Sequence, residues 1–538
     1  MKNSNEPIKM PELLRLRITG AIRYCLIAVA VFSVTAQLFF GCVTPRGFIA
    51  MGLCGLFIMF MIRIRKRTFL PAEKFHKYIL PVLICIGIVV RVVSIVAIPN
   101  RQVSDFQIYH ELARALARGH GFAYTGTTGL LEDLPMYLNK KPALEVTTAF
   151  RPPGFPLMLS LVYRVLGSNP VYGKWLNLLI GMLAGICVYY LLLPVGLKAA
   201  FFASLLWFIY PAHVLATNLL GTELPFVCAL TAGALAINHI PYVKSRFGIL
   251  LACFAGLVLG FGTLIRPEIF IALCAVLALF MIDIPLRRLA LIIFVFTICF
   301  AVAPSLWGLR NYRQFGVFHI QPTNVGMELM TRSPLEMGEK LGSSWRYRLL
   351  VGKLNRSSDE FERSATAKKI AYMHFRKALR HYGVIGFFSN IIIPNWIGAW
   401  EDDEAILTWC CKSEYMATQR DGSPVPVSDI IEDILEIFTA FGYLSVTLFA
   451  LAGIIFFRPA RWTPGIVFLS SYAIVSSILL SVFISKPRFH FVSITVFCIF
   501  AGYFINVFFL MKPEKKSVAS RMKCLFDIPI SKHLHKFL

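Results

Sequence analysis

The stretch Leu289–Trp307 reads LALIIFVFTICFAVAPSLW and contains no charged residue. A helix of this length is long enough to cross the roughly 30 Å hydrocarbon core of a bilayer. Arg287 and Arg288 precede the stretch and Arg310 follows it, so the chain returns to a polar environment at both ends. The sequence therefore predicts a transmembrane helix over 289–307.

Eleven more apolar runs of spanning or near-spanning length lie along the 538 residues. They cover 24–41, 47–62, 79–98, 172–193, 199–215, 224–240, 247–264, 267–284, 434–457, 464–484 and 490–511. Charged residues make up 15% of the chain, whereas a soluble domain carries about 25%. A membrane barrel would instead show alternating segments of about ten residues. We therefore predict an all-α polytopic membrane protein with about twelve transmembrane helices.

The formal net charge of +25 would suggest nucleic acid as the partner of a soluble chain. In a membrane protein, basic residues gather in the cytoplasmic loops and attract anionic lipid, so we expect membrane lipids as partners. With the N-terminus placed inside, the short inner segments hold 25 Lys and Arg residues and the short outer turns hold four. We therefore predict cytoplasmic N- and C-termini and no nucleic-acid partner. The lack of eukaryotic targeting or retention signals favours a bacterial inner membrane.

Two long hydrophilic segments, 99–171 and 308–433, then fall on the outer (periplasmic) side, where we expect juxtamembrane helices. The run Gly383–Trp400 is apolar but is broken by Pro394. We interpret it as an interfacial or re-entrant helix, because a crossing there would move the later basic loops outside. The acidic stretch 401–433 is interpreted as a solvated face, with a cation site as the alternative.

This topology divides the chain into five regions. They are two additional N-terminal helices with a basic loop (1–78), a transmembrane core with the first outer loop (79–307), the second outer loop (308–433), three C-terminal helices (434–511) and a basic cytoplasmic tail (512–538). The 13 cysteines are scattered without the spacing of a metal site. The sequence therefore indicates neither a structural metal nor a disulfide framework.

Gly256 and Gly260 are four residues apart inside the run 247–264. Small residues at this spacing let two membrane helices approach closely. A phosphate-binding loop would need exposed backbone amides at a turn between a strand and a helix. We therefore predict a helix-packing face here.

The first long outer segment begins with Ser104-Asp105-Phe106-Gln107, about seven residues beyond the third apolar run. Ser104 and Gln107 have the spacing of a capping box, and apolar residues then recur at helical intervals. Asp105 therefore belongs to the first turn of an amphipathic helix at the depth of the lipid headgroups. A structural role for Asp105, as a complement to the helix dipole, is the alternative.

Ionisable residues from several other segments reach the same predicted membrane face. Their motifs are Arg151-Pro152-Pro153-Gly154, Thr222-Glu223-Leu224-Pro225-Phe226, Leu264-Ile265-Arg266-Pro267, Trp307-Gly308-Leu309-Arg310-Asn311-Tyr312 and Pro487-Arg488-Phe489. The span centres hold almost no charge, with Arg91 as the chief exception. Transporters usually place such residues near the bilayer midplane. This chain places them where a lipid headgroup would lie.

Together these motifs resemble the GT-C superfamily of glycosyltransferases that use polyprenyl-phosphate sugars. The resemblance is to family 39, which includes protein mannosyltransferases and the aminoarabinose transferases of lipid A. It covers most of the chain after Leu80, so the first two apolar runs are additional. Phe106 follows Asp105, where the family often has a second acid.

The resemblance implies transfer of a sugar from a polyprenyl-phosphate donor to an acceptor lipid, glycan or protein at the outer face. Asp105 would be the general base, since an alcohol acceptor must lose its proton as it attacks. Arg266, Arg310, Arg488 and Arg151 would bind the donor phosphate, because guanidinium groups pair well with phosphate oxygens. Glu223, Tyr109 and His213 would bind substrate. Glu223 and His213 are also candidate ligands for a divalent cation.

Other functions stay open at this level. A lipid or glycan transporter, or a flippase, would find its best support in Arg91 within the third apolar run. A lipid-linked polysaccharide ligase or polymerase would also have large outer loops. A non-catalytic membrane scaffold is the fourth alternative, and loss of function in Asp105→Asn with a normal fold would argue against it. Consumption of a polyprenyl-phosphate sugar by purified protein separates a transferase from a transporter.

Overall fold

The computed structural model of the protein describes residues 12–39, 44–64, 76–125, 145–334, 350, 354, 359–411, 429–457, 462–483, 488 and 490–510. Within these residues the regular structure is helical, apart from one antiparallel pair of short strands, β1 (Ala123–Thr125) and β2 (Glu145–Thr147). The predicted basic tail 512–538 lies outside the described residues.

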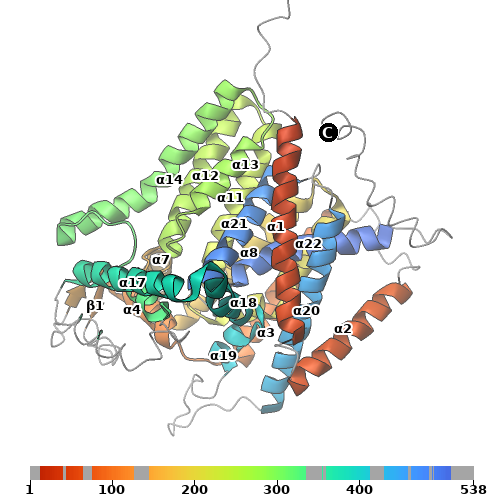
Figure 1. Ribbon diagram of the computed structural model, residues 1–538, viewed down its shortest axis with the longest axis horizontal. Helices are drawn as coiled ribbons and strands as arrows, with labels where there is room; N and C mark the ends of the chain where they lie inside the picture. The colour runs from red at the N-terminus through yellow and green to blue at the C-terminus, as the bar shows by residue number, and fades with distance from the viewer. Residues whose placement is uncertain are drawn as a thin grey trace, which may run out of the picture.

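The helices form a bundle that several shorter helices flank at one end (Figure 1). The first half of the chain contributes α1 (Glu12–Phe39), α2 (Pro45–Ile64), α3 (His76–Ala97), α4 (Ser104–Ala117), α7 (Gly154–Leu166), α8 (Pro170–Leu192), α9 (Leu197–Ile209), α10 (Pro211–Leu215), α11 (Glu223–His239) and α12 (Ser245–Ile265). The second half contributes α13 (Ile271–Phe280), α14 (Leu286–Phe315), α15 (Asn324–Arg332), α17 (Glu360–Phe387), α18 (Ile393–Trp400), α19 (Glu404–Cys411), α20 (Asp429–Phe456), α21 (Pro464–Phe483) and α22 (Phe491–Leu510).

Eleven helical segments in the described part of the chain are long and apolar enough to cross a membrane. The number is up to twelve if α9 and the helical turns Pro211–Asn218 form one span, bent by 57°. The bend falls where Pro211 follows Tyr210, because proline cannot donate the hydrogen bond that would continue the helix. The predicted polytopic all-α membrane fold is confirmed. The helices that qualify as spans differ from the predicted spans at two places.

Polar contacts sort the helix ends onto two sides of the bundle. At one side Arg288 donates to the Val243 carbonyl over 3.1 Å, and Arg15 pairs with Asp283 over 2.8 Å. At the other side, which we call the loop end, Tyr210 donates to Asp403 and Arg488 pairs with Glu223. The predicted inner segments in these contacts therefore lie at one end of the bundle. The predicted outer segments in these contacts lie at the loop end. Which end faces the cytoplasm stays a prediction.

The predicted span 267–284 is the first difference, because only Ile271–Phe280 forms a regular helix there. Ten helical residues extend about 15 Å, half of a hydrocarbon core. The chain nevertheless passes from one end to the other, since Arg266 lies beside α11 near the loop end and Arg288 contacts Val243 at the opposite end. Residues 267–284 therefore still cross the bundle, through a short helix with irregular backbone on either side of it.

The second difference is the segment Glu360–Trp400, which passes the length and hydropathy test for a span. Its first residue, Glu360, accepts hydrogen bonds from Thr148 and Ala149 of the first outer loop. At its other end, the Trp400 carbonyl accepts from Tyr443, close to the Asp403 cluster. Both ends thus lie at the loop end, which supports the predicted interfacial helix over 383–400. Figure 1 shows α17 running across the direction of the long helices.

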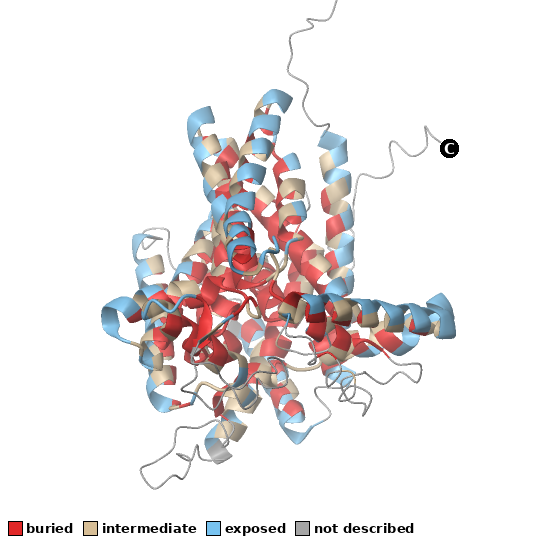
Figure 2. Ribbon diagram, turned by 90° about the vertical axis from the view of Figure 1, so that its left-hand side faces the viewer, coloured by how far each residue is buried: buried red, intermediate tan, exposed pale blue. Residues whose placement is uncertain are grey.

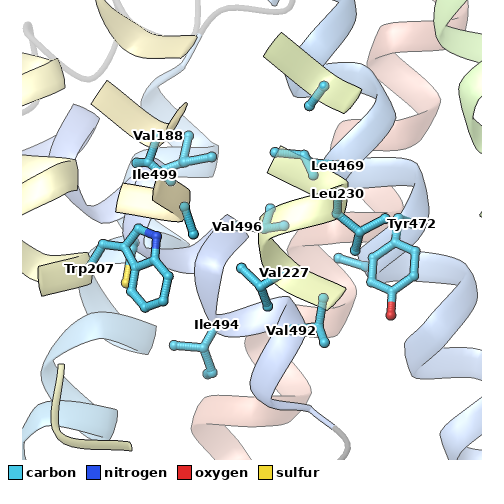
Figure 3. Packing of buried hydrophobic residues seen from close by; sticks show 14 of the residues in the cluster. Val188, Trp207, Val227, Leu230, Leu469, Tyr472, Val492, Ile494, Val496 and Ile499 are labelled. Carbon is cyan, nitrogen blue, oxygen red and sulfur yellow. The ribbon is translucent and has the colours of Figure 1, made fainter. Parts of the chain in front are cut away.

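The core fills the centre of the bundle, and exposed residues concentrate on its periphery and helix ends (Figure 2). Figure 3 shows where α8, α9, α11, α21 and α22 meet, around Trp207, Val227, Leu230 and Ile499, all of them essentially buried. Apolar packing on this scale holds the polar loop end on a rigid base. Large hydrophobic side chains on α2, α12 and α14 stay exposed, as lipid-facing helices require.

The predicted glycine packing face lies between α12 and α14. A Cβ at Gly256 would sit 2.5 Å from the Phe296 carbonyl oxygen, and one at Gly260 would sit 2.2 Å from that of Phe300. Real Cβ atoms do not approach backbone oxygens this closely, so the two helices would have to separate. The helix-packing interpretation of the glycine pair is therefore confirmed.

We expect Gly260→Ala to destabilise the protein by about 1–3 kcal/mol, the usual cost of overpacking, despite the better helix propensity of alanine. Gly262→Ala on the same helix is the matched control, because its Cβ would lie at ordinary contact distance, 3.5 Å from the Ala229 Cβ. Thermal unfolding in detergent measures both. Equal midpoints for the two variants would contradict the packing assignment.

Candidate active site

Helix α4 places Asp105 in its first turn at the loop end, as predicted. The predicted capping box is wrong, because Val103 occupies the N-cap and no side chain caps the helix. Ser104 is instead the first helical residue, with φ of 53°, a left-handed value that non-glycine residues rarely adopt. The preceding Gln102 fixes this turn by accepting from the Leu220 amide and donating to the Asn218 carbonyl.

Asp105 belongs to a chain of ion pairs built from four separate segments. Arg151 donates to one carboxylate oxygen of Asp105 over 2.6 Å, and Arg488 approaches the other at 3.4 Å. The Nε of Arg488 donates to Glu223 over 2.5 Å. The structure therefore joins four predicted site residues in the order Arg151, Asp105, Arg488, Glu223. We call them the ion-pair chain.

The turn that carries Arg151 is seated on the end of α12. A Cβ at Gly154 would lie 2.7 Å from the Ile265 amide nitrogen, so only glycine permits this contact. Backbone bonds from Thr323 and Asn324 to the carbonyls of Ala149 and Phe150 hold the residues just before Arg151. The motif Arg-Pro-Pro-Gly thus directs one guanidinium toward α4.

Both arginines of the chain stay charged. Burial acts to lower the pKa of Arg151, but the Asp105 carboxylate beside it prevails and raises that pKa. Burial also opposes the charge of Arg488, yet Glu223 and then Asp105 raise its pKa. Two guanidinium groups around one carboxylate in turn favour the ionised form of Asp105.

Tyr109 lies one turn after Asp105 on α4 and is buried. Burial raises the pKa of Tyr109 to about 12, with Arg151 acting in the opposite direction. At neutral pH its hydroxyl is therefore a neutral hydrogen-bond donor beside the ion-pair chain. This placement suits the predicted substrate contact, which stays a prediction.

The members of the ion-pair chain differ in their access to a ligand. The side chain of Asp105 is 27% exposed, whereas that of Glu223 is 5% exposed. Arg151 also has a buried Nε that finds no hydrogen-bond partner among the described residues. A buried donor without a partner costs free energy, so this N–H is available to a ligand oxygen. Asp105 is thus the member with the most access to a substrate.

Arg266 lies close to this chain but has its own partners. Its guanidinium stacks over Phe226, in the first turn of α11, and pairs with Glu268 over 3.1 Å. Glu268 also accepts from the Tyr472 hydroxyl over 2.7 Å. The Arg266 side chain is 9% exposed, so a ligand could reach it only by entering between the helices at the loop end.

Arg310 is held by the first outer loop. Its guanidinium donates to the carbonyls of Thr148 and Phe122 over 2.9 and 3.2 Å and stacks on Trp307. The hydrogen bonds to main-chain oxygens tie α14 to the residues just before β1 and just after β2. Phosphate binding by Arg310 stays a prediction, and the structure adds a positioning role that the sequence did not reveal.

His213 lies in a buried aromatic setting, with Trp207, Tyr210 and Phe491 around its ring. The Glu223 carboxylate, the other candidate cation ligand, is engaged by Arg488. Among the described residues, no group of three or more His, Cys, Asp or Glu side chains is arranged to hold a metal. The cation hypothesis for Glu223 and His213 therefore stays a prediction.

Sequence reasoning missed a partly buried carboxylate on the second outer loop. Glu360 accepts from the Ala149 amide over 2.6 Å and from the Thr148 hydroxyl over 3.0 Å. The same two residues are also held by Arg310 and Thr323. The second loop therefore fixes the first loop just before Arg151. No local pattern marks this role, since Glu360 looks like any acid in the first turn of a helix.

A second missed cluster lies two residues beyond Arg488. The His490 ring packs between Trp400 and Tyr443, and its Nδ1 lies 2.5 Å from the Ala399 carbonyl. Its Nε2 lies 3.1 Å from Asp403, which also accepts from the Tyr210 hydroxyl. Both ring nitrogens lie within hydrogen-bond distance of an oxygen atom, so the ring is held on both sides.

This cluster overturns one interpretation of the acidic stretch 401–433. Asp403 is 2% exposed and His490 is fully buried, so at Asp403 the stretch is not a solvated face. The pair connects the end of the second outer loop to the segment that carries Arg488. It therefore fixes one arginine of the ion-pair chain, as Glu360 fixes the other.

No model of a protein family matches the sequence, and neither does any curated protein. Solved structures do resemble the chain. An oligosaccharyltransferase from Archaeoglobus fulgidus, tethered with an acceptor peptide, is 17% identical with a TM-score of 0.46, and the match covers 81% of this chain and 50% of that one. AglB from the same organism, in complex with an inhibitory peptide and a dolichol-phosphate, is 17% identical with a TM-score of 0.45, over 84% and 54% of the two chains.

ArnT from Cupriavidus metallidurans, bound to undecaprenyl phosphate, is 14% identical with a TM-score of 0.36. That match covers 80% of this chain and 76% of ArnT. The chain spans about half the length of the archaeal enzyme. This likeness extends over most of the chain. At these identities and TM-scores it concerns the path of the chain and assigns no activity.

We expect Asp403→Asn to destabilise the protein by about 2–4 kcal/mol, because an amide cannot accept both contacts that the buried carboxylate makes with Tyr210 and His490. Tyr210→Phe removes only one hydroxyl that donates to the same carboxylate and should cost about 1.5–3 kcal/mol. Thermal unfolding in detergent compares the two variants. A smaller loss for Asp403→Asn than for Tyr210→Phe would argue against the contact between Asp403 and His490.

Proposed function

We propose that this chain is an integral membrane glycosyltransferase, with its site on the periplasmic side of a bacterial inner membrane. It transfers a sugar from a polyprenyl-phosphate donor to an acceptor alcohol on a lipid, glycan or protein. One observation carries the proposal. Asp105 is a partly accessible carboxylate held between Arg151 and Arg488 at the end of an apolar bundle.

This placement suits a lipid-linked donor. The tail of a polyprenyl phosphate stays in hydrocarbon, so its phosphate must lie at headgroup depth, where the apolar helices end. Arg151 and Arg488 lie at that level, and each guanidinium has more N–H groups than its contacts with Asp105 and Glu223 use. The positive charges and N–H groups of this chain's own site thus support a lipid-phosphate sugar as the donor substrate.

The proposed reaction is a single displacement at the anomeric carbon. The acceptor oxygen forms the new bond to that carbon while the bond from the carbon to the phosphate oxygen breaks. The acceptor proton passes to the Asp105 carboxylate, and the electron pair leaves with the polyprenyl phosphate. The arginines stabilise the negative charge that builds on the departing phosphate.

Asp105 would be a weak base while both arginines pair with it. A donor phosphate competes for the same guanidinium groups, and the 3.4 Å contact with Arg488 is the weaker of the two. Binding of the donor would therefore loosen Asp105 and make it more basic as the acceptor arrives. The ion-pair chain thus couples donor binding to activation of the base.

The transporter alternative relied on Arg91, and its surroundings give that alternative little support. Arg91 is fully buried, and its Nη1 donates to the carbonyls of Gly87 and Phe208. It also stacks near the rings of Trp207 and Phe208. These contacts join α3 to α9 and have the character of a structural bond between helices.

We expect Asp105→Asn to lower sugar transfer by about 10²–10⁴-fold, the usual contribution of a general base, with the fold intact. The measurement is consumption of a polyprenyl-phosphate sugar by purified protein in nanodiscs. Asp433→Asn is the control, since Asp433 is a half-exposed acid at the same end, paired with Arg46. Wild-type turnover in the Asp105 variant would remove this residue from the chemistry.

Arg310→Ala should lower transfer by about 10²–10³-fold, the loss expected for one contact to a developing negative charge. Arg310→Lys should recover only part, because lysine lacks the planar fork. The KM for the donor separates the two roles of Arg310. A ligand of the phosphate changes donor KM and kcat without changing the unfolding midpoint, whereas a support for the first loop lowers the midpoint as well.

A further inference from the structure

Helix α17 carries an unusual concentration of positive charge at the loop end. From residue 363 to residue 400 the sequence contains no Asp or Glu. Over the same span it contains Arg363, Lys368, Lys369, Arg376, Lys377 and Arg380. The proposed reaction uses none of these residues. Their charge therefore calls for a separate explanation.

Three of these side chains form a line along one face of the helix. Lys369, Arg376 and Arg380 are spaced by seven and four residues, which places them on the same side of an α-helix. All three are exposed, and we call them the basic ridge. On the opposite face, Ala371 and Ala378 are buried against the protein. The ridge therefore points away from the body of the molecule.

The helix lies across the bundle and does not pass through it. Glu360 at its start contacts the first outer loop, and Trp400 at the end of the same segment contacts Tyr443 at the loop end. Figure 1 shows α17 at a steep angle to the long helices, beside α4 and β1. A helix in this orientation follows the plane of the membrane surface.

An exposed apolar patch follows the basic ridge. Val384 is 78% exposed, Ile385 is 86% exposed and Phe388 is 53% exposed. They follow Gly383, whose φ of 65° breaks the helix and changes its direction. Contiguous apolar side chains with this exposure need a nonpolar environment. The hydrocarbon at the loop-end surface of the bilayer supplies one.

We propose that α17 is a membrane-surface helix whose basic ridge binds the headgroups of anionic phospholipids. The apolar patch anchors the helix in the acyl region, and the three cations lie where lipid phosphates and other anionic headgroup atoms lie. Charge complementarity selects the lipid class, because each exposed cation near a membrane surface attracts anionic lipid. This proposal does not depend on the transferase activity.

The position of the ridge gives this binding a consequence for the site. Helix α17 begins at Glu360, which holds Thr148 and Ala149 just before Arg151. Anionic lipid would therefore concentrate beside the ion-pair chain and fix the helix that supports it.

A photo-crosslinking amino acid in place of Met373 tests the proposal on the full chain. Met373 is 51% exposed and lies on the same face as the ridge, four residues after Lys369. The protein is placed in nanodiscs of phosphatidylcholine mixed with phosphatidylglycerol. Mass spectrometry then identifies the crosslinked lipid. We expect phosphatidylglycerol to be enriched several-fold over its share of the bilayer.

Neutralising the ridge with Lys369→Gln, Arg376→Gln and Arg380→Gln together should remove the enrichment. The matched control is Lys244→Gln, Arg246→Gln and Arg287→Gln, which removes the same charge from exposed residues at the opposite end. This control should keep the enrichment.

Either of two results in the otherwise wild-type chain would overturn the proposal. One is crosslinking of both lipids in proportion to the bilayer. The other is no lipid adduct at all, which would place the ridge in water. Both readouts are independent of sugar transfer, so the lipid proposal and the transferase proposal can fail separately.

Discussion

The pairing of Arg488 with Asp105 and Glu223 is the constraint on which the loop end depends. These three charges come from the segment before α22, from α4 and from the start of α11, and they lie on a bundle that is otherwise apolar. Charged groups withdrawn from water must find partners, and breaking such a pair leaves an uncompensated charge. The helices can therefore meet at this end only in an arrangement that brings the carboxylates to the arginines.

The second outer loop completes this arrangement from outside the bundle. Glu360 fixes the residues before Arg151, and Asp403 fixes the segment of Arg488 through His490. Glu360 bonds to the first outer loop and Asp403 to the segment before α22, so the second loop contacts the site from two sides. A rigid apolar base and a loop tied to it at two points together hold the ion-pair chain in one arrangement.

Hydropathy predicted most of the fold because it measures the free energy of leaving water, which decides whether a helix enters a bilayer. Hydropathy could not decide whether an apolar run passes from one end of the bundle to the other or returns to the same end. Residues 267–284 cross with only ten helical residues, and 360–400 pass the hydropathy test although both ends lie at the loop end. In each case polar contacts of the flanking residues, and not the apolar run itself, fix where the chain goes.

The sequence by itself determined the membrane class, the glycine face of α12 and the identity of Asp105, Arg151, Glu223 and Arg488 as site candidates. These follow from local composition, spacing and depth, which neighbouring residues encode. Only the tertiary structure decided which charge meets which, including the loop carbonyls that hold Arg310 and the buried partner of His490. The reason is that partners such as Asp105 and Arg488 are hundreds of residues apart, and their pairing depends on how the whole bundle packs.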